Sequence, residues 1–284
     1  MPALNEAAFI GGAIESVLAQ TFGDFELIVI DNGSSDGTVE IASKYATNDP
    51  RVTVYQEPRQ GISIALNAGL AKCTGTYYAR LDADDVFHPQ KLAIQVAKLQ
   101  TSEPIVTYTE GWIMGPKGEV AGELYNRDRV TLPKGRGEGN IFGPDLFRRN
   151  FILGASVMAS RSVLGTRPFD EGAISGEDWD LWVRLARHYR FEYIPVPTYG
   201  YRIHEGNTWN KRNWRARCRA LIYLYQKWLV EYKDLDDEST RILLRQAIRR
   251  HRELGNLSGA IVLALRHRQS LNLLSESLRR RIRL

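Results

Sequence analysis

The sequence is 284 residues long, and its 43% hydrophobic and 25% charged residues are typical of a globular protein. This composition excludes a disordered or fibrous chain, and the length fits one large α/β domain with an appendage. The formal net charge is +5, but residues 241–284 alone carry +9, so the rest of the chain is mildly acidic. Nucleic acid is therefore not an expected partner, because its binding would place positive charge around the chemistry.

Cysteines and apolar runs bear on location. Cys73 and Cys218 are far apart and lack a CxxC partner, so free, reduced thiols are expected. No apolar run approaches the roughly 20 residues of a membrane-spanning helix. Asn5 and Glu6 interrupt the start of the chain, where a signal peptide would need a long apolar centre. We therefore expect a cytoplasmic protein.

Helices and strands are predicted to alternate over the first hundred residues. Apolar residues at helical spacing after Asn5, a good N-cap residue, predict a helix over residues 7–20. An apolar run over residues 25–30 predicts a buried strand. The pattern continues with helices over 38–46, 62–72 and 89–100 and strands over 52–55, 76–81 and 105–108. Such alternation predicts parallel pairing in a doubly wound α/β sheet.

The second half of the chain is less regular. Residues 110–150 are rich in Gly, Pro and charge, which predicts a long surface excursion able to shape an acceptor site. Extended segments over 155–159 and 194–201 flank a predicted helix over 178–188. Beyond residue 209 the pattern is helical, with breaks at 234–238 and 255–259. We expect one main α/β domain over residues 1–208, in which the motifs described below lie, and a basic helical accessory region over 209–284.

Polar residues follow two of the predicted strands, at the place where open parallel sheets bind ligands. Asp31 fits two interpretations, a turn acid or a ligand for a base N–H or a ribose hydroxyl, and Asp36 is the better helix cap. Asp82, Asp84 and Asp85 lie within four residues. They indicate either a solvated acidic loop or a site for a hard divalent cation such as Mg²⁺ or Mn²⁺.

Acids also open the predicted helix over 178–188. The helix dipole stabilises Glu177 and Asp178 there. An acid at this place can also deprotonate a sugar hydroxyl while Trp179 and Trp182 stack on the apolar face of the sugar. His204 is a candidate metal ligand, although a lone histidine is more often structural.

In their order and spacing over residues 2–208, these motifs resemble those of family 2 glycosyltransferases. The segments that carry the resemblance are Pro2-Ala3-Leu4-Asn5-Glu6, residues 16–21, residues 31–38, Asp82-Ala83-Asp84-Asp85, Glu177-Asp178 and Tyr201-Arg202-Ile203-His204. The family usually has an apolar strand before the first of these segments. We therefore expect the first strand of the sheet to be missing from the start of this chain.

The resemblance implies a GT-A fold, with a mixed, doubly wound sheet, and inverting transfer of a sugar from a nucleoside diphosphate, UDP being favoured, to an acceptor hydroxyl. It implies a divalent cation, Mn²⁺ or Mg²⁺, held by Asp84 and His204 with Asp82 in its shell. Asp178 would be the general base, with Glu177 in support. The residues it implies for the nucleotide site are Pro2, Ala3, Asn5, Glu6, Asp31, Asp82 and Ala83.

Two other functions stay open, a nucleotide-sugar-binding protein without catalysis and a nucleotidyltransferase. The latter would ordinarily show a Gly-rich, basic segment for a triphosphate, which residues 2–6 lack. The expected acceptor is a saccharide or a lipid-linked molecule. The arginines at 279–281 and 283 favour either a solvated basic face or peripheral contact with anionic lipids.

Overall fold

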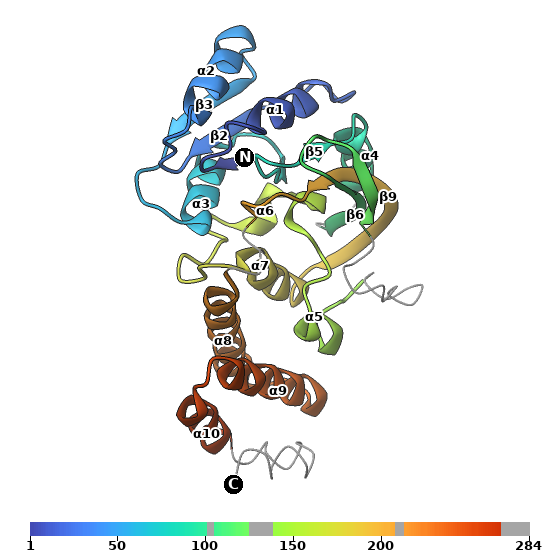
Figure 1. Cartoon of the computed structure of the whole chain (residues 1–284). Coiled ribbons are helices and arrows are strands. Elements are labelled where there is room, and N and C mark those ends of the chain that lie inside the picture. Colours follow the sequence, from blue (N-terminus) through green and yellow to red (C-terminus); the bar gives the residue numbers. More distant parts are fainter. Residues whose placement is uncertain (101–104, 125–138, 208–212, 268–284) are drawn as a thin grey trace. The chain divides into compact units, whose positions relative to one another are not determined.

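The computed structural model describes residues 1–100, 105–124, 139–207 and 213–267 (Figure 1). The chain forms two compact units. The sheet unit comprises residues 1–141, 151–172 and 177–205, and the helical unit comprises 142–150, 173–176 and 206–284. The main division, between residues 205 and 206, lies close to the expected boundary, but two short earlier segments also belong to the helical unit.

The described part of the sheet unit begins with a three-stranded parallel sheet in the order β1 (Pro2–Ala3), β2 (Leu27–Asp31) and β3 (Val52–Gln56). Every residue of β2 is buried, as its apolar run predicts. The strand expected to be missing is represented by the two residues of β1, which pair with Ile30 and Asp31. Asn5 has a positive φ of 56°, a value that asparagine tolerates, and turns the chain away soon after β1.

Three helices accompany these strands, namely α1 (Ile10–Leu18), α2 (Thr38–Asn48) and α3 (Ile62–Lys72). Ile10, Ile14 and Val17 of α1 are buried together with Val29 of β2 in the main core. The predicted alternation of helices and strands is thus confirmed over this part of the chain. Its effect is to bring the loops after β1 and β2 to the same edge of the sheet.

A second, six-stranded sheet lies in the described part of the same unit, in the order β4-β8-β6-β9-β5, with β7 paired to β6. Its strands are β4 (Tyr77–Ala79), β5 (Val86–Phe87), β6 (Ile105–Met114), β7 (Val120–Leu124), β8 (Met158–Ser160) and β9 (Arg190–Arg202). Strands β6 and β9 are parallel, whereas β4 pairs antiparallel with β8. The parallel pairing expected for the 76–81 strand was therefore wrong, because β8 returns beside it from a distant part of the chain.

The expected surface excursion over residues 110–150 was wrong in its first part. Strand β6 continues to Met114, and β7 pairs with it as a hairpin. Further along lies α5 (Pro144–Arg148), while residues 125–138 fall outside the described ranges. Helix α5 belongs to the helical unit, and the described part of the sheet unit also contains α4 (Lys91–Leu99), the 3₁₀ turn η1 (Gly154–Ser156), α6 (Arg161–Leu164) and α7 (Glu177–Ala186).

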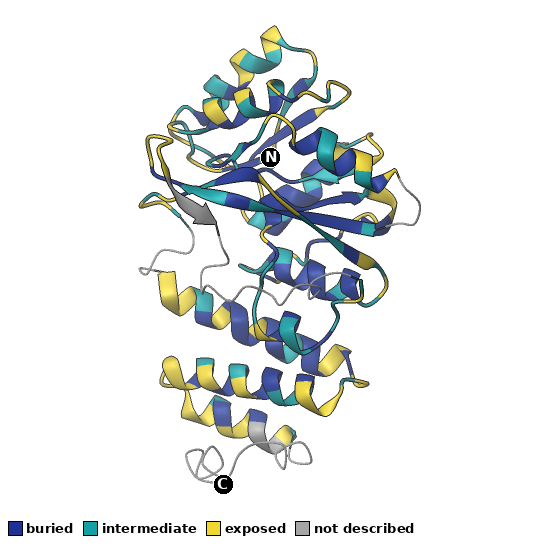
Figure 2. Ribbon diagram, turned by 90° about the vertical axis from the view of Figure 1, so that its right-hand side faces the viewer, coloured by how far each residue is buried: buried dark blue, intermediate teal, exposed yellow. Residues whose placement is uncertain are grey.

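The helical unit contains α8 (Trp214–Glu231), α9 (Asp237–Glu253) and α10 (Leu257–Arg266), with both predicted breaks in place. Asp236 caps α9 by accepting a hydrogen bond of 2.7 Å from the Ser239 amide. Buried residues, dark blue in Figure 2, line one side of these helices. Within the described residues, no helix is both long and apolar enough to cross a bilayer. Cys73 and Cys218 are both free thiols.

Candidate functional site

The loop after β1 and the loop after β2 are joined by hydrogen bonds. The Asn5 amide donates to Ser34 Oγ, and Asn5 Oδ1 accepts from the Ser35 amide, each at 2.9 Å. The Glu6 amide donates to Thr38 Oγ1 at 2.8 Å. Two segments that sequence analysis assigned to one nucleotide site are therefore fixed against each other at the edge of the sheet.

Asp31 and Asp36 shape the second of these loops. Asp31 is 3% exposed and accepts from the amides of Gly33 and Ser34 at 3.2 Å. Asp36 accepts from the amides of Thr38 at 3.1 Å and of Ala7 at 3.0 Å. The turn role considered for Asp31 is thus present, and its role toward a nucleotide stays a prediction.

Two small residues assigned to the nucleotide site lie in the core. Ala3 and Ala83 are 3% and 2% exposed and belong to the main hydrophobic cluster. Pro2 is also buried, in β1. Any nucleotide contact from these residues would come from their backbone.

The acidic turn after β4, residues 82–85, is anchored to the end of β9 by hydrogen bonds from Arg202. The amide of Arg202 donates to Asp85 Oδ1 at 2.9 Å, and its Nε donates to the Asp84 carbonyl at 2.7 Å. Burial raises the pKa of Asp85 well above its ordinary value, with the charges of Asp84 and Asp82 adding to the effect. Asp85 and Arg202 therefore set the shape of the turn that presents Asp84.

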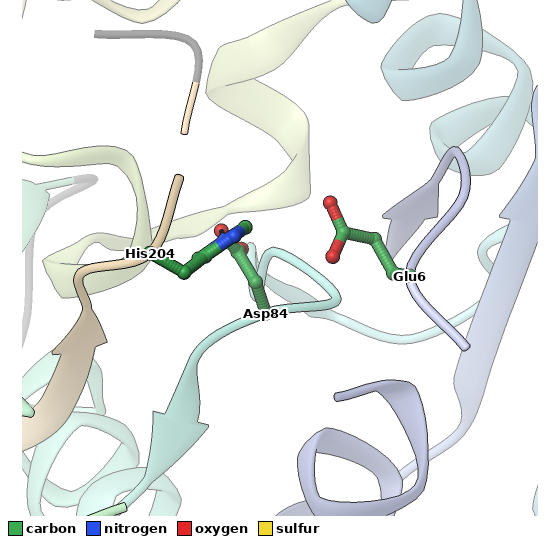
Figure 3. Close-up of side chains that lie close together, drawn as sticks. All are labelled: Glu6, Asp84 and His204. Carbon is green, nitrogen blue, oxygen red and sulfur yellow. Dashed lines mark hydrogen bonds and ion pairs between the residues drawn. The ribbon is translucent and has the colours of Figure 1, made fainter. Parts of the chain in front are cut away.

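Glu6, Asp84 and His204 come together from three separate segments (Figure 3). Each offers one ligand atom, and these atoms lie within 4.8 Å of one another. His204 Nε2 is 3.0 Å from Asp84 Oδ2, and the ring of Phe9 packs on the His204 ring with centroids 4.6 Å apart. Sequence analysis predicted Asp84 and His204 as metal ligands but placed Glu6 among the nucleotide contacts.

The electrostatics of this group fit a divalent cation. Burial raises the pKa of Glu6 to about 7, helped by the nearby charges of Asp84, Asp36 and Asp82. Burial and Asp82 also raise the pKa of Asp84, against the lowering effect of its hydrogen bond to His204. Two carboxylates and an imidazole form a donor set that Mn²⁺ accepts, and carboxylates also suit Mg²⁺.

Asp82 was predicted to belong to the metal shell, but the structure engages it elsewhere. Its two oxygens accept from Arg80, from Nε at 2.8 Å and from Nη2 at 3.1 Å. Arg80 Nη1 donates in turn to Glu177 Oε1 at 2.8 Å. Among the described residues, the group able to hold a cation consists of Glu6, Asp84 and His204 without Asp82.

Helix α7 begins with the two acids predicted for catalysis, directly after Gly176, whose φ is +79°. Asp178 is half-buried, and its Oδ1 lies 2.6 Å from the amide of Trp179. The charge of Asp178 also contributes to raising the pKa of Arg80, whose Nη1 donates to the adjacent Glu177. The start of α7 and the acidic turn therefore face a common arginine.

The acceptor role predicted for two tryptophans is not compatible with their burial. Trp179 and Trp182 are 5% and 2% exposed, and Trp182 Nε1 donates to the Ile152 carbonyl at 2.9 Å. Stacking on a sugar requires an accessible ring face. These rings instead belong to the packing of α7, whose apolar stripe faces the interior.

Arg80 and Arg202 belong to the site but were not predicted from the sequence. Arg80 follows β4 directly and lies two residues before Asp82, but nothing in the local sequence shows that it also reaches Glu177. For Arg202 no local signal exists, since its partners Asp84 and Asp85 lie more than a hundred residues earlier.

The fold matches solved glycosyltransferase structures. Staphylococcus aureus TarS, residues 1–349, in complex with UDP-GlcNAc has a TM-score of 0.66 and 17% identity, with 97% of this chain and 80% of that one covered. The mannosyltransferase PcManGT from Pyrobaculum calidifontis, in complex with GDP-Man and Mn²⁺, has a TM-score of 0.63 and 18% identity, with 96% and 74% covered. The architecture is thus the GT-A fold of glycosyltransferases.

Sequence comparison gives the family. The model of glycosyl transferase family 2 matches residues 1–142, and this chain belongs to that family. A PGL/p-HBAD biosynthesis glycosyltransferase of Mycobacterium tuberculosis is 30% identical over 206 residues, which are 70% of this chain and 74% of that protein. An uncharacterized glycosyltransferase of Rickettsia felis is 31% identical over 186 residues, 66% of this chain and 29% of that protein. The chain thus spans less than a third of the length of such relatives.

Proposed function

We propose that this chain transfers a sugar from a nucleoside diphosphate donor, UDP being favoured, to an acceptor hydroxyl with inversion of the anomeric carbon. The observation that carries the proposal is the meeting of Glu6, Asp84 and His204 within 4.8 Å, beside the two joined loops. Family membership supports it. So do the UDP-GlcNAc and the GDP-Man with Mn²⁺ held by two proteins of the same fold.

In this proposal the donor binds at the edge of the sheet. Asn5 and Asp31 belong to the two loops that would receive the base and ribose, and Asp82, in the acidic turn, would contact the ribose. Glu6, Asp84 and His204 would hold Mn²⁺ or Mg²⁺. When bound, the cation offsets the charge that develops on the departing diphosphate.

Asp178 is the proposed general base. It would take the proton of the acceptor hydroxyl as that oxygen attacks the anomeric carbon, while the bond from this carbon to the diphosphate breaks. Its place at the start of α7 suits a carboxylate that must be ionised before it acts, because a helix N-terminus stabilises negative charge. Glu177 is tied to Arg80 by the ion pair and would act in support.

The acceptor side is proposed in outline, as a saccharide or lipid-linked molecule in polysaccharide or glycolipid synthesis. The names of two relatives, the PGL/p-HBAD biosynthesis glycosyltransferase of Mycobacterium tuberculosis and the chondroitin synthase of Pasteurella multocida, support this class. In the helical unit, α10 exposes Leu257, Ile261 and Val262. This face would suit peripheral contact with an anionic lipid surface. The arginines at 279–281 and 283, for which the same contact is expected from the sequence, lie outside the described residues.

The test is turnover by the purified chain. We expect it to release UDP from at least one UDP-sugar in the presence of Mn²⁺ and a saccharide acceptor, and to lose this activity in EDTA. Saturable nucleotide-sugar binding without any release of nucleotide, over a panel of UDP-, dTDP- and GDP-sugars, would favour the non-catalytic binding protein instead. Release of pyrophosphate from a nucleoside triphosphate would favour the nucleotidyltransferase.

A further inference from the structure

We infer that Arg80 is a positioning residue, whose guanidinium sets the separation between the acidic turn after β4 and the start of helix α7. The inference rests on the proposed function, because these two elements carry the donor-side acids and the proposed base. The hydrogen bonds of Arg80 go to Asp82 and Glu177, so we infer that it positions Asp84 in the turn and Asp178 in the helix through these two neighbours.

The guanidinium of Arg80 donates hydrogen bonds to Asp82 on one side and to Glu177 on the other. Nε and Nη2 donate to the two oxygens of Asp82 at 2.8 and 3.1 Å, which is the bidentate geometry of a strong arginine–carboxylate pair. Nη1 donates to Glu177 Oε1 at 2.8 Å. The two acids are separated by more than ninety residues of sequence. A lysine, with a single ammonium on a flexible stem, cannot reproduce this planar bridge.

The Arg80–Glu177 part of the bridge is buried, so water does not replace it readily, whereas the Asp82 side chain is 32% exposed. Arg80 is 9% exposed and Glu177 is 5% exposed. Burial acts to lower the pKa of Arg80, but Asp82, Glu177 and Asp178 outweigh it and hold that pKa well above its usual range. The guanidinium therefore stays charged. It is the common counter-ion of Asp82 in the acidic turn and of Glu177 and Asp178 at the start of α7.

Gly154 packs closely against the Arg80 side chain. A Cβ at this position would lie 3.1 Å from Arg80 Cδ and Nη1 and 3.2 Å from Cζ. These distances are tighter than ordinary contacts, so an alanine here would push Arg80 by a few tenths of an ångström without removing its charge. Gly154→Ala therefore displaces the Arg80 side chain but keeps its guanidinium. Arg80→Lys keeps the positive charge but removes the planar guanidinium that bonds to both acids.

Small displacements of this kind affect catalysis more than binding. A misplacement of about 1 Å can cost on the order of 100-fold in rate, because the reacting atoms must be aligned. Asp82 belongs to the acidic turn, and Glu177 is the neighbour of Asp178. The distance between Asp82 and Glu177 therefore sets the distance between the acidic turn and Asp178. We therefore expect changes at Arg80 to lower kcat while leaving nucleotide-sugar affinity nearly intact.

The experiment compares Arg80→Lys, Gly154→Ala and the control Gly23→Ala, which has no atom within 4 Å of its added Cβ. Each variant is assayed for kcat, for the KM of the nucleotide sugar and for thermal unfolding. We expect Arg80→Lys to lose roughly tenfold or more in kcat, Gly154→Ala to lose a smaller part, and KM to stay within about threefold of the wild type. Gly23→Ala should match the wild type.

A second readout separates positioning from mere stability. In Arg80→Ala, added guanidinium or methylguanidinium should restore part of kcat, and ammonium should not, because only a planar fork rebuilds the bridge. If Arg80→Ala does not fold, the Arg80→Lys and Gly154→Ala comparison decides alone. Wild-type kcat in both variants, or a loss of kcat that follows the loss of folded protein, would overturn the inference. A wild-type protein that turns over no nucleotide sugar would instead overturn the proposed function, and the inference with it.

Discussion

Among the residues proposed to hold the cation, Glu6 has a raised proton affinity. Its pKa is about 7 in the folded chain, raised by burial and by the charges of Asp84, Asp36 and Asp82, against 4.5 for an ordinary glutamate. Between these two values the folded chain keeps a proton that the unfolded chain has lost. The stability of the metal-free protein therefore falls as pH rises from about 4.5 to 7, and the whole penalty is present above pH 7.

Glu6→Gln removes this penalty. In EDTA, we expect the variant to melt a few degrees higher than the wild type at pH 8 and by a smaller margin at pH 5, because the amide never has to ionise. Differential scanning fluorimetry across the pH range measures this. Glu40→Gln, at an exposed position of α2, is the control. Wild-type and Glu6→Gln curves that stay parallel from pH 5 to pH 8 would contradict the assignment.

Asp178→Asn tests the proposed base. The amide keeps the size of the side chain but cannot accept the hydroxyl proton, so we expect transfer to fall by about 10²- to 10⁴-fold. Calorimetric titration should show nucleotide-sugar affinity close to that of the wild type. Unchanged turnover would remove Asp178 from the role, and joint loss of binding and turnover would assign it to the donor site.

At the scale of elements, the contact between β6 and β9 has no room for a side chain at Gly111. An added Cβ would lie 2.6 Å from the Tyr199 carbonyl oxygen and 2.7 Å from its ring. Gly111→Ala should therefore destabilise the chain by about 1–3 kcal/mol or more, as overpacking does. Gly12→Ala, on the open face of α1, should be neutral or stabilising, by up to about 1 kcal/mol. Equal midpoints of the two variants in urea would contradict this account of the strand pair.

Elements defined by local pattern were predictable from the sequence. The helix expected over residues 62–72 is α3 with the same bounds, and Gly61 directly precedes it. Strands β2 and β3 follow from their apolar runs. Non-local pairing was not predictable, since nothing near β4 indicates that β8 will lie beside it. The same reason hid the continuation of β6 opposite β9, where Gly111 and neighbouring polar residues obscure the strand pattern.

The candidate site was predictable to the same degree. Asp84 and His204 were expected to meet, and they lie 3.0 Å apart. Local sequence could not show that the fork of Arg80 occupies both oxygens of Asp82, or that Glu6 turns toward Asp84. Each of these depends on how loops from separate strands converge. The burial of Trp182 has a similar origin, because a helix shows an apolar stripe whether it faces a core or a ligand.

For the whole molecule, the distribution of charge leads to a prediction about surfaces. Residues 241–284 carry +9, and α10 exposes Leu257, Ile261 and Val262 at 62%, 38% and 48%. We expect the chain to co-sediment with vesicles that contain anionic lipid, and salt to weaken this binding, because the attraction is screened. Val262→Asp should reduce it further. Equal sedimentation with neutral and anionic vesicles at all salt concentrations would contradict lipid contact through this face.

The central claim is that Asp84, with Glu6 and His204, holds a cation that grips a nucleoside diphosphate. Titration calorimetry of UDP with the wild type and with Asp84→Asn, each with Mn²⁺ and with EDTA, tests it most directly. We predict that Mn²⁺ strengthens UDP binding to the wild type by roughly tenfold or more, equivalent to about 1.4 kcal/mol, and that this gain is absent in the variant. The same gain in Asp84→Asn, or none in the wild type, would contradict the account.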